Sequence, residues 1–205
     1  MAQPSLNERV NSNIVAVAAL ERDAELMLRV RDGDQASFGL LLERHRNPVI
    51  HFLYRIVQNQ AVADELAQEV FLRVYRSRST YEPTAKFTTW LFRIATHLAL
   101  NWLRDRKGEK LQESLDQQME DGAPRQVADR SKTIEQALVY RVKLEEVRQA
   151  IALLPAKQKA AVVMHKYEEL EYSQIANALR CSESAVKSLL FRAYESLRAR
   201  LAHMA

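Results

Sequence analysis

The chain has 205 residues, of which 47% are hydrophobic and 27% charged, so it can bury one ordinary core or two small ones. A bias towards Ala, Leu, Arg, Glu and Gln, with only 4 Gly and 5 Pro, favours an all-α architecture over any sheet protein. The net charge of +4 permits a polyanionic partner. The single cysteine, Cys181, excludes an internal disulfide and a cysteine-cluster metal site, and it fits a reducing compartment, so we expect a cytoplasmic protein.

Residues 1–22 are expected to form a poorly ordered N-terminal tail, in which Val15–Leu20 can add a helical turn onto the following domain. The apolar run Ile14–Leu20 is short, follows no basic segment and is flanked by Asn13 and Glu21. It therefore predicts neither a secretory signal nor a membrane span, and we expect no membrane insertion.

A first helical block is predicted over residues 23–110, where the helical periodicity is nearly continuous. It breaks at residues 32–34, near 59–60 and from 77 to 83, which predicts four helices. The expected helices are Ala24–Arg31, Gln35–Ile56, Val62–Arg76 and Thr88–Arg106. Pro48 lies inside the second helix and predicts a kink or a break there, because proline lacks a backbone N–H.

The third expected helix buries an apolar stripe and exposes a group of acids and an amide. We call this exposed group the acidic patch, and it consists of Asp64, Glu65, Gln68 and Glu69. Carboxylates near the start of a helix also interact favourably with the positive end of the helix dipole, which is a purely structural role. The alternative use is docking onto a basic protein partner.

The fourth expected helix carries a buried stripe and a second strip of different chemistry. The buried stripe is Phe87, Leu91, Ile94, Ala95, Leu98 and Trp102. The second, which we call the Trp90 strip, is Trp90, Arg93, His97, Asn101 and Arg104. An indole among guanidiniums suits unstacked single-stranded DNA, because bases stack on the ring while the cations neutralise phosphates. A core or rim tryptophan on an ordinary solvated helix is the alternative.

The loop before this helix, Arg78–Lys86, holds small polar groups and a tyrosine. Among them, Ser79, Thr80 and Tyr81 can contact the edge of a flipped base. The loop can equally be an ordinary connector.

Periodicity fails over residues 111–135, where Gly122 and Pro124 appear and acids outnumber bases, so we expect a flexible acidic linker. A second helical block follows over residues 136–205. Its first helix has one apolar face of Leu144, Val147, Ile151 and Leu154, and Pro155 ends it. Because the linker tethers the blocks loosely, we expect two domains that grip one extended partner at separated points.

The segment Tyr172–Arg198 has two short amphipathic helical patterns with a tight polar break between them, which is typical of a helix-turn-helix. The inner faces are Ile175, Ala176 and Leu179, then Val186, Leu190, Ala193 and Leu197. Ser182 can cap the second helix. The opposite side, which we call the reading face, presents Ser184, Lys187, Ser188, Phe191 and Arg192, and it suits a DNA major groove. Such helix pairs also occur in proteins that never bind nucleic acid.

Several short motifs follow one another in a set order. They are Asp64-Glu65-Leu66-Ala67-Gln68-Glu69-Val70-Phe71, Phe-x-x-Trp-Leu-x-x-Ile-Ala from Phe87 to Ala95, Leu154-Pro155, Tyr172-Ser-Gln-Ile175-Ala176 and Val186-Lys187-Ser188. In this order the chain resembles the extracytoplasmic-function (ECF) group of bacterial RNA polymerase sigma factors, from about Asp23 to Leu201. The resemblance implies a region-two domain over 23–110 and a region-four domain over 136–205.

The resemblance also implies a function and its residues. The chain would direct core RNA polymerase to promoters, with the acidic patch docking on the polymerase. The near-start promoter element would be opened, and its non-template strand captured, by Ser79, Thr80, Tyr81, Lys86 and the Trp90 strip. The reading face would bind the upstream element as duplex DNA. Members of the family are commonly held inactive by an anti-sigma factor, so such a partner is also expected.

The chain departs from the family pattern in both domains. His97 and Asn101 stand where the family usually has Asn and Asp, Ser184-Ala185 replace Gly-Thr, and Leu189 replaces Arg. The promoter preference of other members therefore does not transfer.

We expect no enzymatic activity, cofactor or metal, because the sequence has no nucleophile with a matching base, no metal-ligand cluster and no glycine-rich phosphate loop. Two other functions stay open on the sequence. One is a helix-turn-helix regulator that binds DNA alone, with the first block for sensing or dimerisation. The other is a helical adaptor that binds only proteins.

Overall fold

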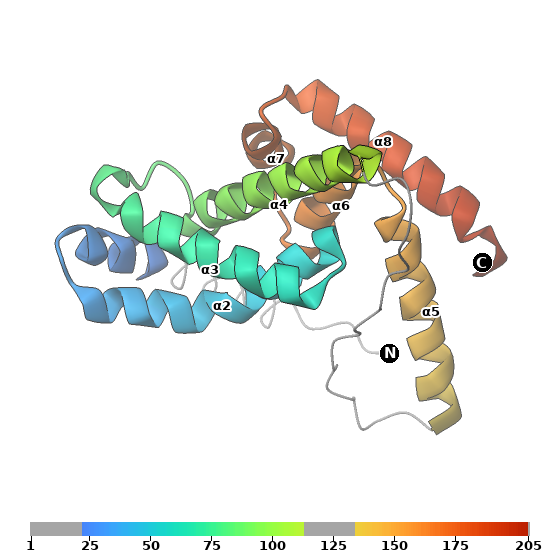
Figure 1. The fold of residues 1–205 in the computed structure, drawn as a ribbon, viewed down its shortest axis with the longest axis horizontal. Helices are drawn as coiled ribbons and strands as arrows, with labels where there is room; N and C mark the ends of the chain where they lie inside the picture. Colours follow the sequence, from blue (N-terminus) through green and yellow to red (C-terminus); the bar gives the residue numbers. More distant parts are fainter. Residues whose placement is uncertain (1–21, 113–133, 205) are drawn as a thin grey trace, which may run out of the picture.

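The computed structural model describes the backbone of residues 22–112 and 134–204, and the side chains of 22–106 and 141–204. Over these residues the chain consists of helices and connecting turns, which confirms the predicted all-α class (Figure 1). No helix in the described ranges is long and apolar enough to cross a membrane. The predicted N-terminal tail and nearly all of the predicted acidic linker lie outside the described residues.

The first block has the predicted order of helices. A helix over residues 22–31 is followed by α2 (Gln35–Val57) and α3 (Gln60–Arg76). The short 3-10 helix η1 (Arg78–Thr80) and a loop then lead to α4 (Phe87–Gln112).

Local side-chain chemistry explains where these helices begin. Gly33 has a φ of +102°, a conformation that residues with a Cβ rarely adopt, and it turns the chain before α2. Asp34 then caps α2 by accepting a hydrogen bond from the Ala36 N–H (2.9 Å). Asn59 caps α3 in the same way, accepting from the Val62 N–H (3.0 Å).

Of the kink or break predicted at Pro48, the break is wrong, because α2 runs through this residue without interruption. Pro48 is exposed, so water can donate a hydrogen bond to the backbone carbonyl that lacks an N–H partner because of the proline. The buried neighbours Val49 and Ile50 hold the helix against the core. The end of α4 was also predicted too early, since the helix continues past Arg106 to Gln112.

The second block begins with α5 (Ile134–Ala152), which projects away from the other helices in Figure 1. After it come α6 (Ala156–Tyr167), α7 (Tyr172–Leu179) and α8 (Glu183–Arg200). The 3-10 helix η2 (Ala202–Met204) ends the described chain.

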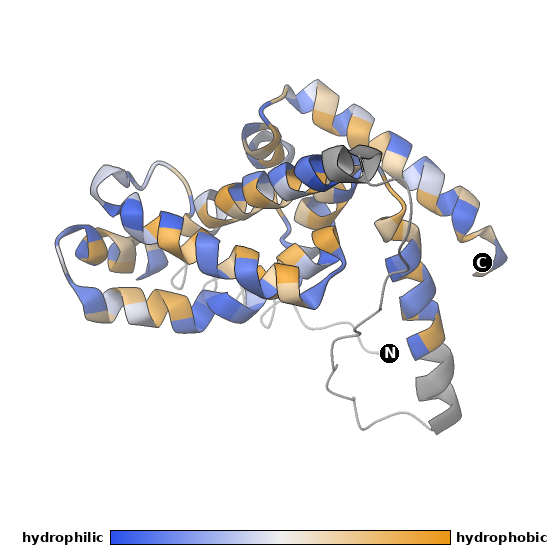
Figure 2. Ribbon diagram, viewed as in Figure 1, coloured by the Kyte–Doolittle hydropathy of each residue, from blue (hydrophilic) through white to orange (hydrophobic). Residues whose placement is uncertain are grey.

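The buried apolar side chains of the two blocks form one continuous core. Phe52 and Phe92 pack in the first block with ring centroids 4.9 Å apart, while Met164 and Ile175 are fully buried in the second. Each helix carries both hydrophobic and hydrophilic residues (Figure 2). The two blocks are in contact, because α6 packs against α2 and α4, and α7 packs against α4. This contact between the blocks was not predicted from the sequence, which led us to expect separately moving domains.

Candidate nucleic-acid and polymerase interfaces

Helix α8 has the start and the buried side that the sequence predicts for the second helix of a helix-turn-helix. The Ser182 side chain accepts a hydrogen bond from the Ala185 N–H (3.2 Å), and so caps the helix. Val186, Leu190 and Ala193 are buried. The opposite side of α8 is exposed and can meet a partner.

The structure brings the five residues of the reading face together on the exposed side of α8. Phe191 is 68% exposed, which is unusual for a phenylalanine and leaves its ring available for apolar contact, such as with a thymine methyl group. Lys187 and Arg192 are exposed on the same helix and can meet phosphates or guanine edges.

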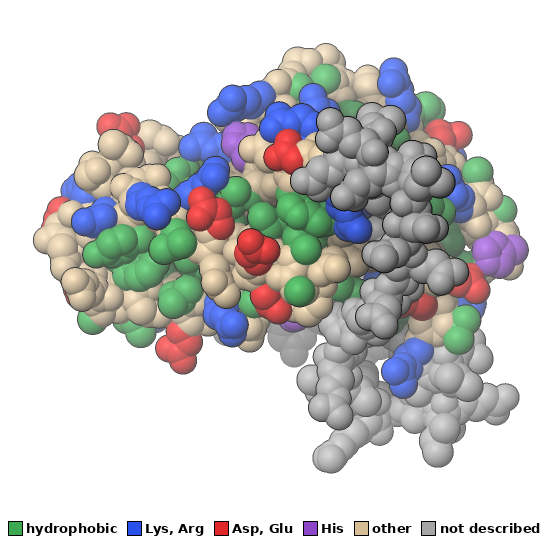
Figure 3. All heavy atoms as spheres, in the orientation of Figure 1, with side chains coloured by type: hydrophobic (Ala, Val, Ile, Leu, Met, Phe, Trp, Pro, Cys, Tyr) green, Lys and Arg blue, Asp and Glu red, His purple; other side chains and the backbone are tan. Residues whose placement is uncertain are grey.

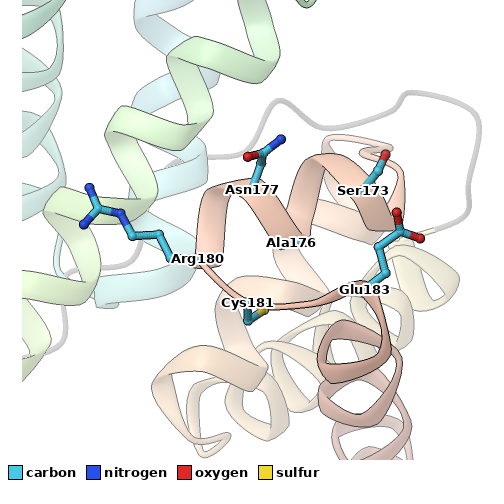
Figure 4. A pocket seen from close by; sticks show the side chains of 6 residues that line it. All are labelled: Ser173, Ala176, Asn177, Arg180, Cys181 and Glu183. Atoms are coloured by element: carbon cyan, nitrogen blue, oxygen red, sulfur yellow. The ribbon is translucent and has the colours of Figure 1, made fainter.

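An open hollow lies beside the turn between α7 and α8 (Figure 4). The hollow is lined by Ser173, Ala176, Asn177, Arg180, Cys181 and Glu183. Arg180 adopts the left-handed conformation that ends α7, with φ 50°, and its side chain extends towards α4 in the close-up view. The tip of the helix-turn-helix thus lies close to the first block.

The Trp90 strip follows α4 as predicted, but its members differ in exposure. Arg93, Asn101 and Arg104 are exposed, whereas Trp90 and His97 are half-buried. The His97 Nε2 forms a hydrogen bond with the Ala178 carbonyl of α7 (2.9 Å). One residue of the strip is therefore already occupied by the second block.

The environment of His97 disfavours the charged imidazolium. Burial lowers its pKa, although the hydrogen bond to the Ala178 carbonyl opposes this effect. Arg180 and Arg93 lower the pKa further through their positive charges. A neutral imidazole that donates through Nε2 fits this site.

Tyr81 differs from the expected loop side chain. Ser79, Thr80 and Lys86 are exposed, but Tyr81 is only 3% exposed and its ring packs edge-on to Trp90, with centroids 5.0 Å apart. Burial raises the pKa of its hydroxyl, and the Asp23 carboxylate adds to the shift. In this structure the Tyr81 ring packs against the Trp90 ring, and the Tyr81 hydroxyl group does not face solvent.

A second buried side of α4 was missed from the sequence. Thr89, Phe92, Thr96 and Ala99 are buried in addition to most of the predicted stripe. Phe92 is a large apolar residue that the predicted stripe left out, whereas the two threonines and the alanine give little hydrophobic signal of their own. Their short side chains at helical spacing indicate a close approach by another helix.

The acidic patch lies on α3, and Figure 3 shows acidic side chains over this helix. Glu65 and Gln68 are exposed. Glu69 pairs with Arg73 on the same helix (2.7 Å), and Gln60 donates to Asp64 (3.2 Å). Two of the four predicted docking residues are thus fully available, and two make intrahelical contacts at the surface.

Comparison with known proteins assigns both blocks. The Sigma-70 region 2 family matches residues 41–109, and the Sigma-70 region 4 family matches residues 144–197. The RNA polymerase sigma-H factor of Pseudomonas aeruginosa is 32% identical over 180 residues, which are 86% of this chain and 92% of that protein. The ECF RNA polymerase sigma-E factor of Haemophilus influenzae is 32% identical over 178 residues, covering 85% and 93%. The chain belongs to the ECF sigma factors.

As a member of this family, the sigma factor directs core RNA polymerase to promoters for transcription initiation. Solved structures share its fold. CnrH in complex with the cytosolic domain of CnrY matches with a TM-score of 0.64 at 19% identity, over 90% of this chain and 99% of that one. RpoE of Bartonella quintana, solved with the anti-sigma factor NepR, matches with a TM-score of 0.64 at 20% identity, over 80% and 96%.

Proposed function

We propose that this sigma factor divides promoter recognition between its two blocks. The reading face of α8 binds the upstream element as intact duplex. The Trp90 strip of α4, with Ser79, Thr80 and Lys86, opens the near-start element and holds its non-template strand, while Tyr81 packs against Trp90 and holds its ring in position. The observation that carries this proposal is the presence of two separate cationic and aromatic surfaces on different helices. One is centred on Phe191 and the other on Trp90.

The two surfaces differ in a way that suits duplex and single-stranded DNA. The reading face is a convex, single-helix surface that fits a major groove. Trp90 is half-buried and supported by Phe87 and Tyr81, so its ring is held in place as a platform for an unstacked base. A rigid platform loses less conformational entropy when it binds a base.

We further propose that the acidic patch docks on core polymerase. Its exposed members Glu65 and Gln68 offer a carboxylate and an amide to a basic partner surface. The sigma factor would act by binding alone, without catalysis, and in the cytoplasm, where core polymerase works. An anti-sigma factor is a further expected partner, as family membership suggests.

Separate substitutions test the division of labour. Trp90→Ala should reduce promoter opening by the equivalent of roughly 1–3 kcal/mol, because one base loses its stacking surface. Lys187→Ala should weaken upstream duplex binding and lower the salt dependence of that binding by about one counterion. Permanganate reactivity of thymines measures opening, and a salt titration of duplex binding measures the second effect.

Trp102→Ala is the matched control for Trp90→Ala, because Trp102 is a half-buried indole on the same helix outside the strip. It should leave opening nearly unchanged once folding is confirmed. If Trp90→Ala opened the promoter as well as the unmodified chain, the strip would not be the capturing surface.

A further inference from the structure

A buried carboxylate lies in the helix over residues 22–31, at the end of the first block that also carries η1 (Figure 1). Asp23 is 3% exposed and accepts hydrogen bonds from two neighbouring residues of α2. One bond comes from the Arg44 guanidinium and the other from His45 Nε2 (2.8 Å). The helix that carries Asp23 precedes the part of the chain that matches Sigma-70 region 2.

Stability alone does not explain this polar cluster. A buried carboxylate loses its hydration, and a buried ion pair often contributes no more to stability than apolar residues of the same volume. What charged hydrogen bonds add is direction, because they form in only a narrow range of distances and angles. Asp23 therefore fixes the position of the His45 ring in a way that an apolar contact does not.

The His45 ring continues into the aromatic cluster that supports the Trp90 strip. It packs against Phe87, with ring centroids 5.4 Å apart, and Phe87 packs against Trp90 (5.9 Å) and Tyr81 (6.3 Å). Phe87 is fully buried and begins α4, so it links the polar cluster to the helix that carries the strip. A change in the position of His45 therefore alters the packing around Trp90.

Asp23 also lies near Tyr81, the second ring that packs on Trp90. Burial raises the pKa of the Tyr81 hydroxyl, and the negative charge of Asp23 raises it further. The hydroxyl has no hydrogen-bond partner among the described residues, so it does not fix the Tyr81 side chain. The directional anchor of the aromatic cluster is thus the bond between Asp23 and His45.

We propose that Asp23 is a positioning residue for strand capture, which acts through His45 and Phe87 to hold the Trp90 ring as a platform for an unstacked base. The inference rests on the proposed function of the Trp90 strip. Asp23 is buried and makes no contact with DNA itself. Its removal leaves the reading face of α8 unchanged but lets the Trp90 ring move, so binding of the opened strand falls because ordering the ring then costs conformational entropy.

The first arm of the test observes the Trp90 ring in the full-length chain. The chain has two tryptophans, so Trp102→Phe leaves Trp90 as the single source of indole fluorescence. In this background Asp23→Ala should raise the acrylamide quenching constant of Trp90 by about twofold, because a loosely packed ring is more accessible. Far-UV circular dichroism confirms that each variant is folded.

His45→Phe is a second, milder variant for the same measurement. It keeps an aromatic ring against Phe87 and leaves Asp23 paired with Arg44, but it removes the directional bond from the ring to Asp23. It should shift the quenching constant in the same direction by a smaller amount. Glu25→Ala is the matched control, because it removes an exposed carboxylate from the same helix and should change neither quenching nor promoter opening.

The second arm measures promoter opening by holoenzyme assembled from core polymerase and each full-length variant. The probe is a promoter fragment chosen by start-site mapping with the unmodified sigma factor, and permanganate reactivity reports its opening. Asp23→Ala should lower the equilibrium constant for opening about threefold to tenfold, which is part of the contribution of one base stack. When Trp90→Ala is already present, Asp23→Ala should lower opening by less than about twofold, because the ring that it positions is absent.

The outcomes separate positioning from the proposed function. If Asp23→Ala and His45→Phe leave Trp90 quenching or opening unchanged, or if Asp23→Ala lowers opening equally with and without Trp90, the positioning role is wrong and strand capture stands. If Trp90→Ala itself leaves opening unchanged, the proposed role of the Trp90 strip fails, and the positioning role fails with it. Higher quenching, with a loss of opening that disappears in the Trp90→Ala background, supports both.

Discussion

At the scale of single residues, Glu168 has an unusual environment for a carboxyl group. Burial raises its pKa to about 7, and the nearby Arg55 guanidinium lowers it only in part. Arg55 belongs to α2 and also lies over the Tyr167 ring, 4.2 Å from its centroid. Glu168 therefore sits where the end of α6 meets the first block.

Ionisation of Glu168 should make folding stability depend on pH. Because the folded state raises the carboxyl pKa, the associated stability is complete below about pH 4.5 and is lost as the pH rises towards about 7. Glu168→Gln should leave stability nearly unchanged at pH 4.5 and increase it at pH 8 by up to about 3 kcal/mol. Urea unfolding at the two pH values measures the difference.

The neighbouring Glu169→Gln is the control, since it removes an exposed carboxylate from the same turn. Equal effects of the two substitutions at pH 8, or no effect of either, would show that the burial of Glu168 does not influence stability.

At the scale of helices, the start of α8 depends on one hydroxyl group. Ser182 has extended backbone geometry, and its side chain accepts a hydrogen bond from the Ala185 N–H. This bond satisfies one of the backbone N–H groups that have no partner within the helix. The exposed reading face has little packing to order its first turn, so the cap contributes directly to its geometry.

Ser182→Ala should destabilise the second block by about 1 kcal/mol, the usual cost of losing a serine N-cap. Ser173→Ala, at an exposed position inside α7, should have little effect. Thermal unfolding measures stability, and amide hydrogen exchange at the start of α8 localises the change. Unaltered exchange there in Ser182→Ala would contradict the role of the cap.

Helix positions and the exposed sides of α3 and α8 could be predicted, because hydrophobic period, capping residues and glycine are local properties of the sequence. The predictions failed where a helix is buried on more than one side. Thr96 and Ala99 of α4 carry no hydrophobic signal, and Tyr81 in a polar loop gave no sign that its ring packs beneath Trp90. The break predicted at Pro48 does not occur, because the buried neighbours Val49 and Ile50 hold α2 against the core, and this packing is a tertiary effect.

At the scale of the whole molecule, the sequence predicted two helical blocks but not their contact. The Lys159–Ile56 bond joins residues 103 positions apart, and the His97–Ala178 bond joins residues 81 positions apart. No periodicity relates residues so distant in the chain. The composition of the segment between the blocks favoured independent motion, whereas the continuous core shows a specific way for the blocks to pack.

The most direct test of the account is transcription of fragmented genomic DNA by purified core polymerase, with and without this sigma factor, followed by mapping of RNA 5′ ends. The account predicts new, discrete start sites, each preceded by the same two-part element, which disappear when Trp90→Ala and Lys187→Ala are combined. An unchanged set of start sites in the presence of the sigma factor would contradict it.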